Sequence, residues 1–315
     1  MMLSALFSVG DKMGKSKKGK QRIYRIISII SVLGFVACSL VLLYPVISDR
    51  WNRYRDDQLV TNYNKTVREA DTSKIDAIRE EAMKYNKYLR LQNRSIVTDA
   101  EYEPDDYYET LLNVADNGIM GYVEIPKIDV TEPIYHYSHE VSLGKGVGHI
   151  HGSSLPVGGK STHSVLTGHR GLPTQKFFSD LDKIVVGDKF YLHVLNEIMA
   201  YRVYNITTIE PSDVDALFIE DSRDLVTLVT CTPYGVNTHR LLVMGERIPN
   251  DELKVDSEGN IVIENHEFII DPAVWVFIGF IVFIFIVFFV TLIKNIKYKI
   301  AKKKSSKEKA EGDSG

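Results

Sequence analysis

Cysteine is nearly absent from this chain, since its 315 residues contain only two, Cys38 and Cys231. Two thiols cannot supply the network of disulfides that staples small secreted domains, so that class of fold is excluded. The sequence also has no group of cysteines at the spacing of zinc sites. The chain also has no large excess of acidic or basic residues, because its formal net charge is −3.

Charged residues are absent from two long stretches, 26–47 and 273–293. Each is long and apolar enough to cross the hydrocarbon core of a membrane, about 30 Å thick, as a helix. Seven Lys or Arg precede the first stretch and eight lysines follow the second. Basic residues of this kind flank membrane spans on the cytoplasmic side. We therefore expect a two-pass protein of the cell membrane, with tails 1–25 and 294–315 in the cytoplasm and residues 48–272 outside. No clean signal cleavage site follows the first stretch, which favours a retained anchor.

The segment between the two spans is acidic and holds a single cysteine. It contains 37 Asp and Glu against 23 Lys and Arg, a net charge near −14, which argues against nucleic acid as a partner. Cys38 lies within the first span, where we expect a lipid-facing or helix-packing residue. Cys231 is thus the lone exported thiol. Because such a thiol is an oxidation liability, its presence favours a chemical role.

The sequence pattern of the outer segment changes from helical to extended near residue 119. Residues 54–91 are charged and have apolar positions at helical spacing, with Ser73 and Asp76 resembling a capping box, and they predict one or two helices. Residues 96–108 are acidic, aromatic and irregular and predict a loop. A single further helix is predicted over 174–181. Short strands separated by turn residues are predicted over 121–125, 128–134, 164–167, 189–194, 198–209, 225–231 and 240–246. Seven or eight such strands indicate a small closed barrel or a sandwich.

Three residues in this extended region suggest a catalytic site. Cys231 ends the apolar run Thr-Leu-Val-Thr-Cys, and Arg240 begins the next run after a tight turn, so neighbouring strands would place the thiol beside the guanidinium. His169 lies upstream in Thr-Gly-His-Arg-Gly. A thiolate nucleophile needs a proton donor for its leaving amine and positive charge near the developing oxyanion. Histidine supplies the first and arginine the second.

These motifs resemble the sortases, the membrane-anchored cysteine transpeptidases of Gram-positive bacteria. The resemblance covers residues 113–248, and the preceding helices and second span are similar to class C, the pilus-assembling branch. It implies a mainly β, closed eight-stranded sortase barrel over 113–250, after a helical segment and lid over 48–112 and before a tether over 251–272. It also implies that Cys231 attacks an LPxTG-like sorting signal and that a lysine amine of a pilin resolves the thioacyl enzyme. His169 would then be the general acid/base, and Arg240 would position the substrate and stabilise the oxyanion.

A lid across the active site is a further feature that the resemblance implies. Class C relatives carry it on an Asp-Pro-aromatic motif before the barrel. The corresponding stretch here contains Asp99, Glu101 and Tyr102 but no intervening proline. A lid and an ordinary acidic linker both fit this sequence.

Two other motifs resemble cofactor-binding sites but lack residues that such sites require. His149, His151 and His163 lie close together in the sequence, but no carboxylate or cysteine at metal-site spacing accompanies them, so we expect no metal. Gly159-Lys160-Ser161 imitates the end of a phosphate-binding loop, yet Ser154 stands where that loop requires glycine. We interpret this segment as a turn.

The expected partners are pilins or other surface proteins with a C-terminal sorting signal, together with the membrane. Two alternatives stay open at this point. One is a sortase that joins proteins to peptidoglycan or mainly hydrolyses its substrate, and the other is a membrane-tethered assembly module in which the cysteine is inert. The exact sorting motif does not follow from the sequence.

Overall fold

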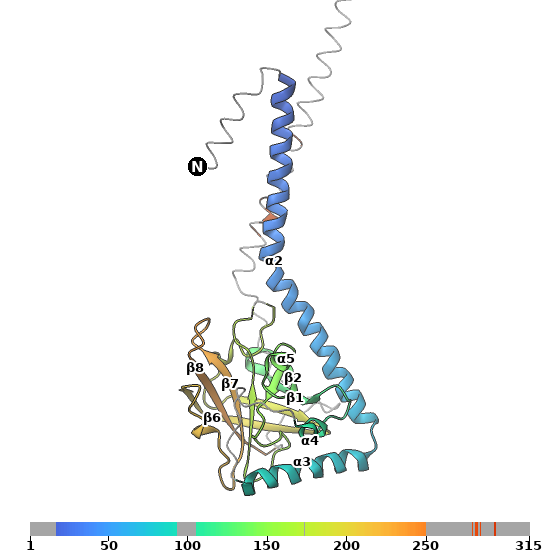
Figure 1. The fold of residues 1–315 in the computed structure, drawn as a ribbon, viewed down its shortest axis with the longest axis vertical. Coiled ribbons are helices and arrows are strands. Elements are labelled where there is room, and N and C mark those ends of the chain that lie inside the picture. Colours follow the sequence, from blue (N-terminus) through green and yellow to red (C-terminus); the bar gives the residue numbers. More distant parts are fainter. Residues whose placement is uncertain are drawn as a thin grey trace, which may run out of the picture. The chain divides into compact units, whose positions relative to one another are not determined.

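The computed structural model describes residues 17–92, 105–172 and 174–249, together with 279, 281–282, 284 and 293. The chain divides into two units, Met1–Val262 and Ile263–Gly315. All of the strands belong to the first unit, as do the two long helices (Figure 1). The tether predicted over 251–272 and the lid residues Asp99, Glu101 and Tyr102 lie outside the described residues.

Eight strands close into a barrel in the order β1-β2-β3-β4-β7-β8-β6-β5, with β5 pairing back to β1. The pairs β2–β3 and β4–β7 are parallel, and the other neighbours are antiparallel. Closure leaves no free sheet edge, which suits a sheet of short strands. The strands are β1 (Ile119–Ile125), β2 (Val130–His136), β3 (Val147–His149), β4 (Thr162–Thr167), β5 (Lys189–Val194), β6 (Glu197–Ile209), β7 (Asp224–Thr232) and β8 (His239–Arg247).

Alternation along the strands produces apolar clusters on opposite faces of the sheet. Val226 and Leu228 of β7 belong to the main core, whereas Val229 packs in a second cluster with Leu242 of β8 and Leu217 of the short 3-10 helix η4 (Asp215–Leu217). Successive side chains of a strand point to opposite faces. Residues 231 and 240 share the alternation of Val229 and Leu242, so they lie on the face opposite the main core.

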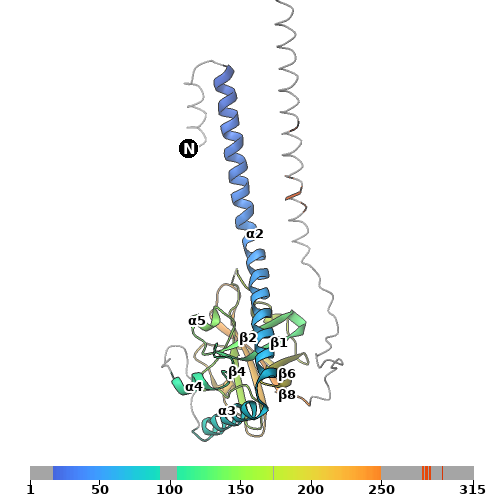
Figure 2. The same ribbon diagram turned by 90° about the vertical axis from the view of Figure 1, so that its right-hand side faces the viewer.

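Two long helices precede the barrel and pack on it (Figures 1 and 2). Helix α2 spans Lys17–Glu69, and α3 spans Thr72–Gln92. The part of α2 nearest the barrel is tied to it by Tyr63, whose hydroxyl donates to the Met120 carbonyl at 3.0 Å and accepts from the Leu195 amide at 2.8 Å. Helix α3 buries Ile75, Ala82, Tyr85 and Leu89, which confirms the predicted helical spacing.

One helix among the described residues is long and apolar enough to cross a membrane, over Ile29–Glu69 within α2. It includes most of the first stretch predicted from the sequence, 26–47. The second predicted span, 273–293, falls almost entirely outside the described residues, so the two-pass arrangement stays a prediction.

Several local predictions were wrong. Residues 174–181 do not form a helix but a turn followed by the 3-10 helix η3 (Leu181–Lys183). The predicted loop over 96–108 overlaps a short helix, α4 (Asp106–Thr110), and the strand β3 was missed because it has only three residues. Helix α3 begins earlier than the Ser73–Asp76 capping box: the Asp71 carboxylate accepts from the Ser73 amide at 2.9 Å.

Candidate active site

Cys231 and Arg240 are direct partners across the antiparallel pair β7–β8. Their side chains leave the same face of the sheet, because residues opposite each other on antiparallel strands point the same way. The Cys231 side chain is partly exposed. Arg240 donates from Nη1 to the carbonyls of Asn237 at 3.3 Å and His239 at 3.2 Å. The hairpin therefore sets the arginine and the partly exposed thiol directly opposite each other on neighbouring strands, which is the pairing that the sequence predicted.

His169 reaches the same end of the barrel through the parallel pair β4–β7. The register runs to Thr167 opposite Val229, and two further bonds extend it. The Gly168 amide donates to the Val229 carbonyl at 3.1 Å, and the Thr230 hydroxyl donates to the Gly168 carbonyl at 2.8 Å. His169 and Cys231 each lie two residues beyond the last ladder pair. The three residues that the sequence singled out thus come from three adjacent strand ends.

The His169 ring is largely buried and has one unoccupied nitrogen. Among the described residues Nε2 has no hydrogen-bond partner, although it is inaccessible to solvent. The exposed Glu140 carboxylate, at the start of helix α5 (Glu140–Leu143), lies 3.7 Å from this nitrogen. A buried polar atom without a partner is costly in a folded protein. Its presence in a cluster with a thiol and a guanidinium is typical of a site that is completed by substrate.

Arg170 links the segments that carry His169 and Cys231, although no sequence pattern marked it as part of the site. Its side chain is 7% exposed and donates to the Thr232 hydroxyl at 3.0 Å and to the Asp182 carboxylate at 2.5 Å. Its guanidinium also lies 5.8 Å from the centre of the Tyr234 ring. Thr232 directly follows Cys231. The position of Arg170 next to His169 was the available signal, but its two hydrogen-bond partners are 12 and 62 residues away.

The other histidines have structural partners. His149 is fully buried between the Tyr108 hydroxyl, 2.6 Å from Nδ1, and the Ser154 carbonyl, 2.8 Å from Nε2. Burial lowers its pKa to about 3. His163 bonds the Thr227 hydroxyl, and His151 lies beyond the end of β3, 3.6 Å from the Asp105 carboxylate. No three potential ligands converge within the described ranges.

Comparison with known proteins matches residues 123–248 to the sortase domain. Streptococcus pneumoniae sortase C is 42% identical, with 61% of this chain and 97% of that chain covered and a TM-score of 0.58. This chain belongs to the sortase family. Streptococcus agalactiae sortase C1 is 43% identical, with 62% and 100% covered and a TM-score of 0.56. Bacillus anthracis sortase A is 24% identical over 230 residues, 73% of this chain and 96% of the relative. Sortases are cysteine transpeptidases, and this sortase is an enzyme of that class.

Proposed function

We propose that Cys231, His169 and Arg240 are the catalytic residues of a sortase that polymerises pilins. The observation that carries this proposal is the pairing of Cys231 with Arg240 on β7–β8, with His169 at the adjacent end of β4. The substrate would be an LPxTG-like sorting signal at the C-terminus of a pilin or surface protein. The acceptor would be a lysine amine of the next pilin.

The proposed reaction has two acyl transfers. The Cys231 thiolate attacks the threonine carbonyl of the signal, and a C–S bond forms. The C–N bond to glycine then breaks, and His169 gives its proton to the leaving amine. In the second step the lysine amine attacks the thioester, loses a proton to His169 and forms an amide, and the thiolate leaves. Arg240 holds the carbonyl oxygen in both steps, where negative charge develops.

The pilin specificity is supported by likeness to class C enzymes. The structure of Streptococcus pneumoniae sortase C is described as giving insight into pilin substrate specificity. A second similar structure is sortase C1 of pilus island 1 from the group B streptococcus. Both are at least 40% identical to this chain, whereas Bacillus anthracis sortase A is 24% identical. The higher identity favours pilin polymerisation over anchoring to peptidoglycan.

Substitution of each residue tests the catalytic assignment. Cys231→Ala should abolish the thioacyl intermediate with a sorting-signal peptide, detected by intact-protein mass. His169→Ala and Arg240→Ala should each lower turnover by about 10²-fold or more. Cys38→Ala and His239→Ala are matched controls. The Cys38 thiol lies in α2, away from the barrel, and the partly exposed His239 imidazole lies near Glu210. Wild-type turnover in the Cys231 variant would refute the assignment.

We further propose that α2 anchors the enzyme in the cell membrane and that residues 273–293 form a second span. The length and apolar composition of α2 and the basic residues at both ends of the chain support this topology. Tags before Lys12 and after Lys309 should resist external protease in intact protoplasts, while the barrel should be digested. Cleavage of the C-terminal tag would refute the second span.

A further inference from the structure

Helix α2, which contains the first predicted membrane span, also binds the loop that follows His169. Asp49, Asn52 and Asp56 lie on one face of α2, at helical positions i, i+3 and i+7. The Asn52 side-chain amide donates to the Thr174 carbonyl at 2.9 Å. The Lys176 backbone amide donates to the Asp49 carboxylate at 3.1 Å. Between these, the Gln175 side chain donates to Asp56. Three consecutive loop residues are thus each bound by a different position of α2.

The same loop is closed on itself at His169. The Phe178 amide donates to the His169 carbonyl at 3.1 Å, and the Gly171 amide donates to the Ser179 hydroxyl at 3.0 Å. Phe178 is fully buried against Gly168. The loop is therefore a short arch whose feet meet at His169 and whose crown is held by α2. A displacement of the crown would be transmitted to the His169 backbone through the bond from Phe178, which lies two residues after Lys176.

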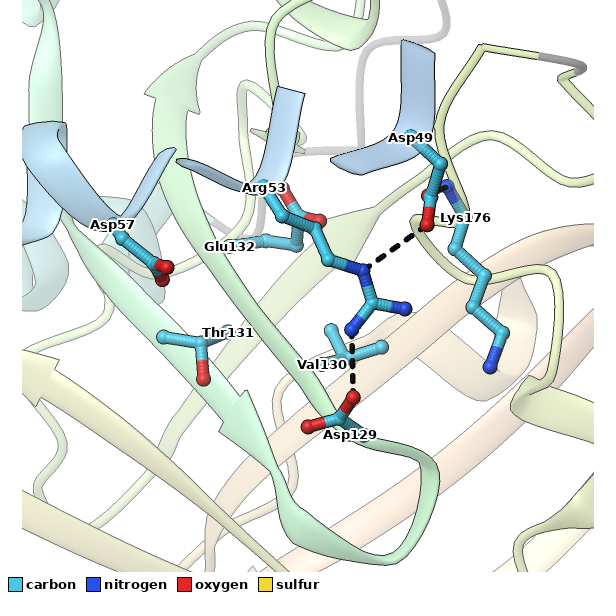
Figure 3. A pocket seen from close by; sticks show the side chains of 8 residues that line it. All are labelled: Asp49, Arg53, Asp57, Asp129, Val130, Thr131, Glu132 and Lys176. Carbon is cyan, nitrogen blue, oxygen red and sulfur yellow. Dashed lines mark hydrogen bonds and ion pairs between the residues drawn. The ribbon is translucent and has the colours of Figure 1, made fainter. Parts of the chain in front are cut away.

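A charged pocket of about 140 Å³ lies where α2 meets β2 and the arch (Figure 3). Arg53 of α2 donates to Asp49 at 3.2 Å and to Asp129 at 2.6 Å, so the helix also holds the turn before β2. Gln175 is 3% exposed and lies within 3.5 Å of Glu132 of β2 as well as contacting Asp56. Helix, strand and arch are joined by buried polar groups, which hold a defined geometry more strictly than apolar contacts do.

We infer that α2 is a positioning element of the active site, and that Asp49, Asn52 and Asp56 hold the arch 174–176 so that His169 stays aligned with Cys231. This inference rests on the proposed role of His169. None of the three α2 residues touches the reacting atoms. A misplacement of a catalytic group by about 1 Å can cost on the order of 10² in rate, so loss of one arch bond is expected to lower kcat by about tenfold.

The test uses the full chain in detergent micelles, a sorting-signal peptide and a primary-amine acceptor. Asp49→Ala and Asn52→Ala should each lower kcat by about tenfold with KM changed less than twofold. Asp49→Asn should restore kcat, because its amide oxygen still accepts from Lys176. Asp57→Ala is the matched control: Asp57 lines the same pocket on the same helix without bonding the arch. Unchanged melting temperatures exclude unfolding as the cause.

A double-mutant cycle separates positioning from a general structural effect. In a His169→Ala background, Asn52→Ala should lower the residual acylation rate no further, because the helix acts through the imidazole. Equal effects of Asn52→Ala in both backgrounds, or unchanged kcat in both Asp49→Ala and Asn52→Ala, would overturn the inference. Full activity of His169→Ala alone would instead overturn the proposed catalytic role. The two failures are therefore distinguishable.

Discussion

Replacing Asp56 by asparagine is expected to stabilise the folded protein at pH 8 and to leave its stability unchanged at pH 4. The Asp56 side chain is 1% exposed, and burial raises its pKa to about 6, although Arg55 and Gln175 oppose the shift. Glu132 is 5% exposed, and its pKa is also raised by burial and by the neighbouring Asp56. The other charged or titratable groups that face this pair are Asp49, Arg53, Asp57, Asp129, Tyr135 and Lys176.

The sign and size of this change in stability follow from the linkage between protonation of Asp56 and folding. A carboxyl group with a raised folded-state pKa stabilises the fold below its unfolded pKa of about 3.9, and that contribution is lost as the pH rises through about 6. A rise of about two units corresponds to roughly 3 kcal/mol at pH 8. Solvent near Arg55, which is partly exposed, screens part of this. We therefore expect Asp56→Asn to gain about 2 kcal/mol at pH 8, or roughly 4–8 °C in Tm.

The assay is thermal unfolding of the wild type and the variant at intervals from pH 4 to pH 8. The difference in Tm should be near zero at pH 4 and should grow through pH 6. Asp57→Asn removes the same charge from an exposed position of α2 and leaves the buried carboxyl in place, so its difference should be much smaller at every pH. A constant difference for Asp56→Asn at all pH values, or a larger one at pH 4, would refute the account of Asp56 as a buried carboxyl that ionises at a cost.

Substitutions at three further positions probe the site and its support. Arg170→Gln should lower the acylation rate about tenfold, and Arg170→Lys should recover part of it through Asp182, because the guanidinium joins the His169 and Cys231 segments. Gly168→Ala should lower kcat without raising KM, since its new Cβ would lie 2.8 Å from the buried Phe178 ring. His149→Asn should flatten the loss of Tm between about pH 6.5 and pH 4: the wild-type imidazole, with its pKa lowered to about 3, stabilises the fold above its unfolded pKa and loses that contribution as the pH falls.

Results that would contradict these three expectations are equally specific. A wild-type acylation rate in Arg170→Gln would show that the bonds of Arg170 to Thr232 and Asp182 do not set the site geometry. An unchanged kcat in Gly168→Ala would mean that the Phe178 ring can move aside. A pH dependence of Tm in His149→Asn parallel to that of the wild type would assign the acid sensitivity to another group.

The candidate site was predictable from the sequence because its main parts are local. Cys231 and Arg240 are nine residues apart, so one tight hairpin turn is enough to pair them. The scarcity of cysteine then marked Cys231 as a candidate nucleophile before any fold was known. Alternation of apolar residues likewise predicted most of the strands, since each strand shows its period within a few residues. The lid residues Asp99, Glu101 and Tyr102 remain a prediction.

Only the tertiary structure decided how distant segments meet. The parallel pairing of β4 with β7, the link from Arg170 to Thr232 and the bond from Asn52 to Thr174 join residues that are 62 to 122 positions apart. No local period encodes such contacts, because each depends on how the whole barrel closes. The segment 174–181 shows the same effect: its residues can form a helix, but the bonds from α2 and to His169 hold it as an arch. Sequence by itself determined the thiol, the arginine opposite it and the strands that carry them, whereas packing determined which distant groups bind the loop after His169.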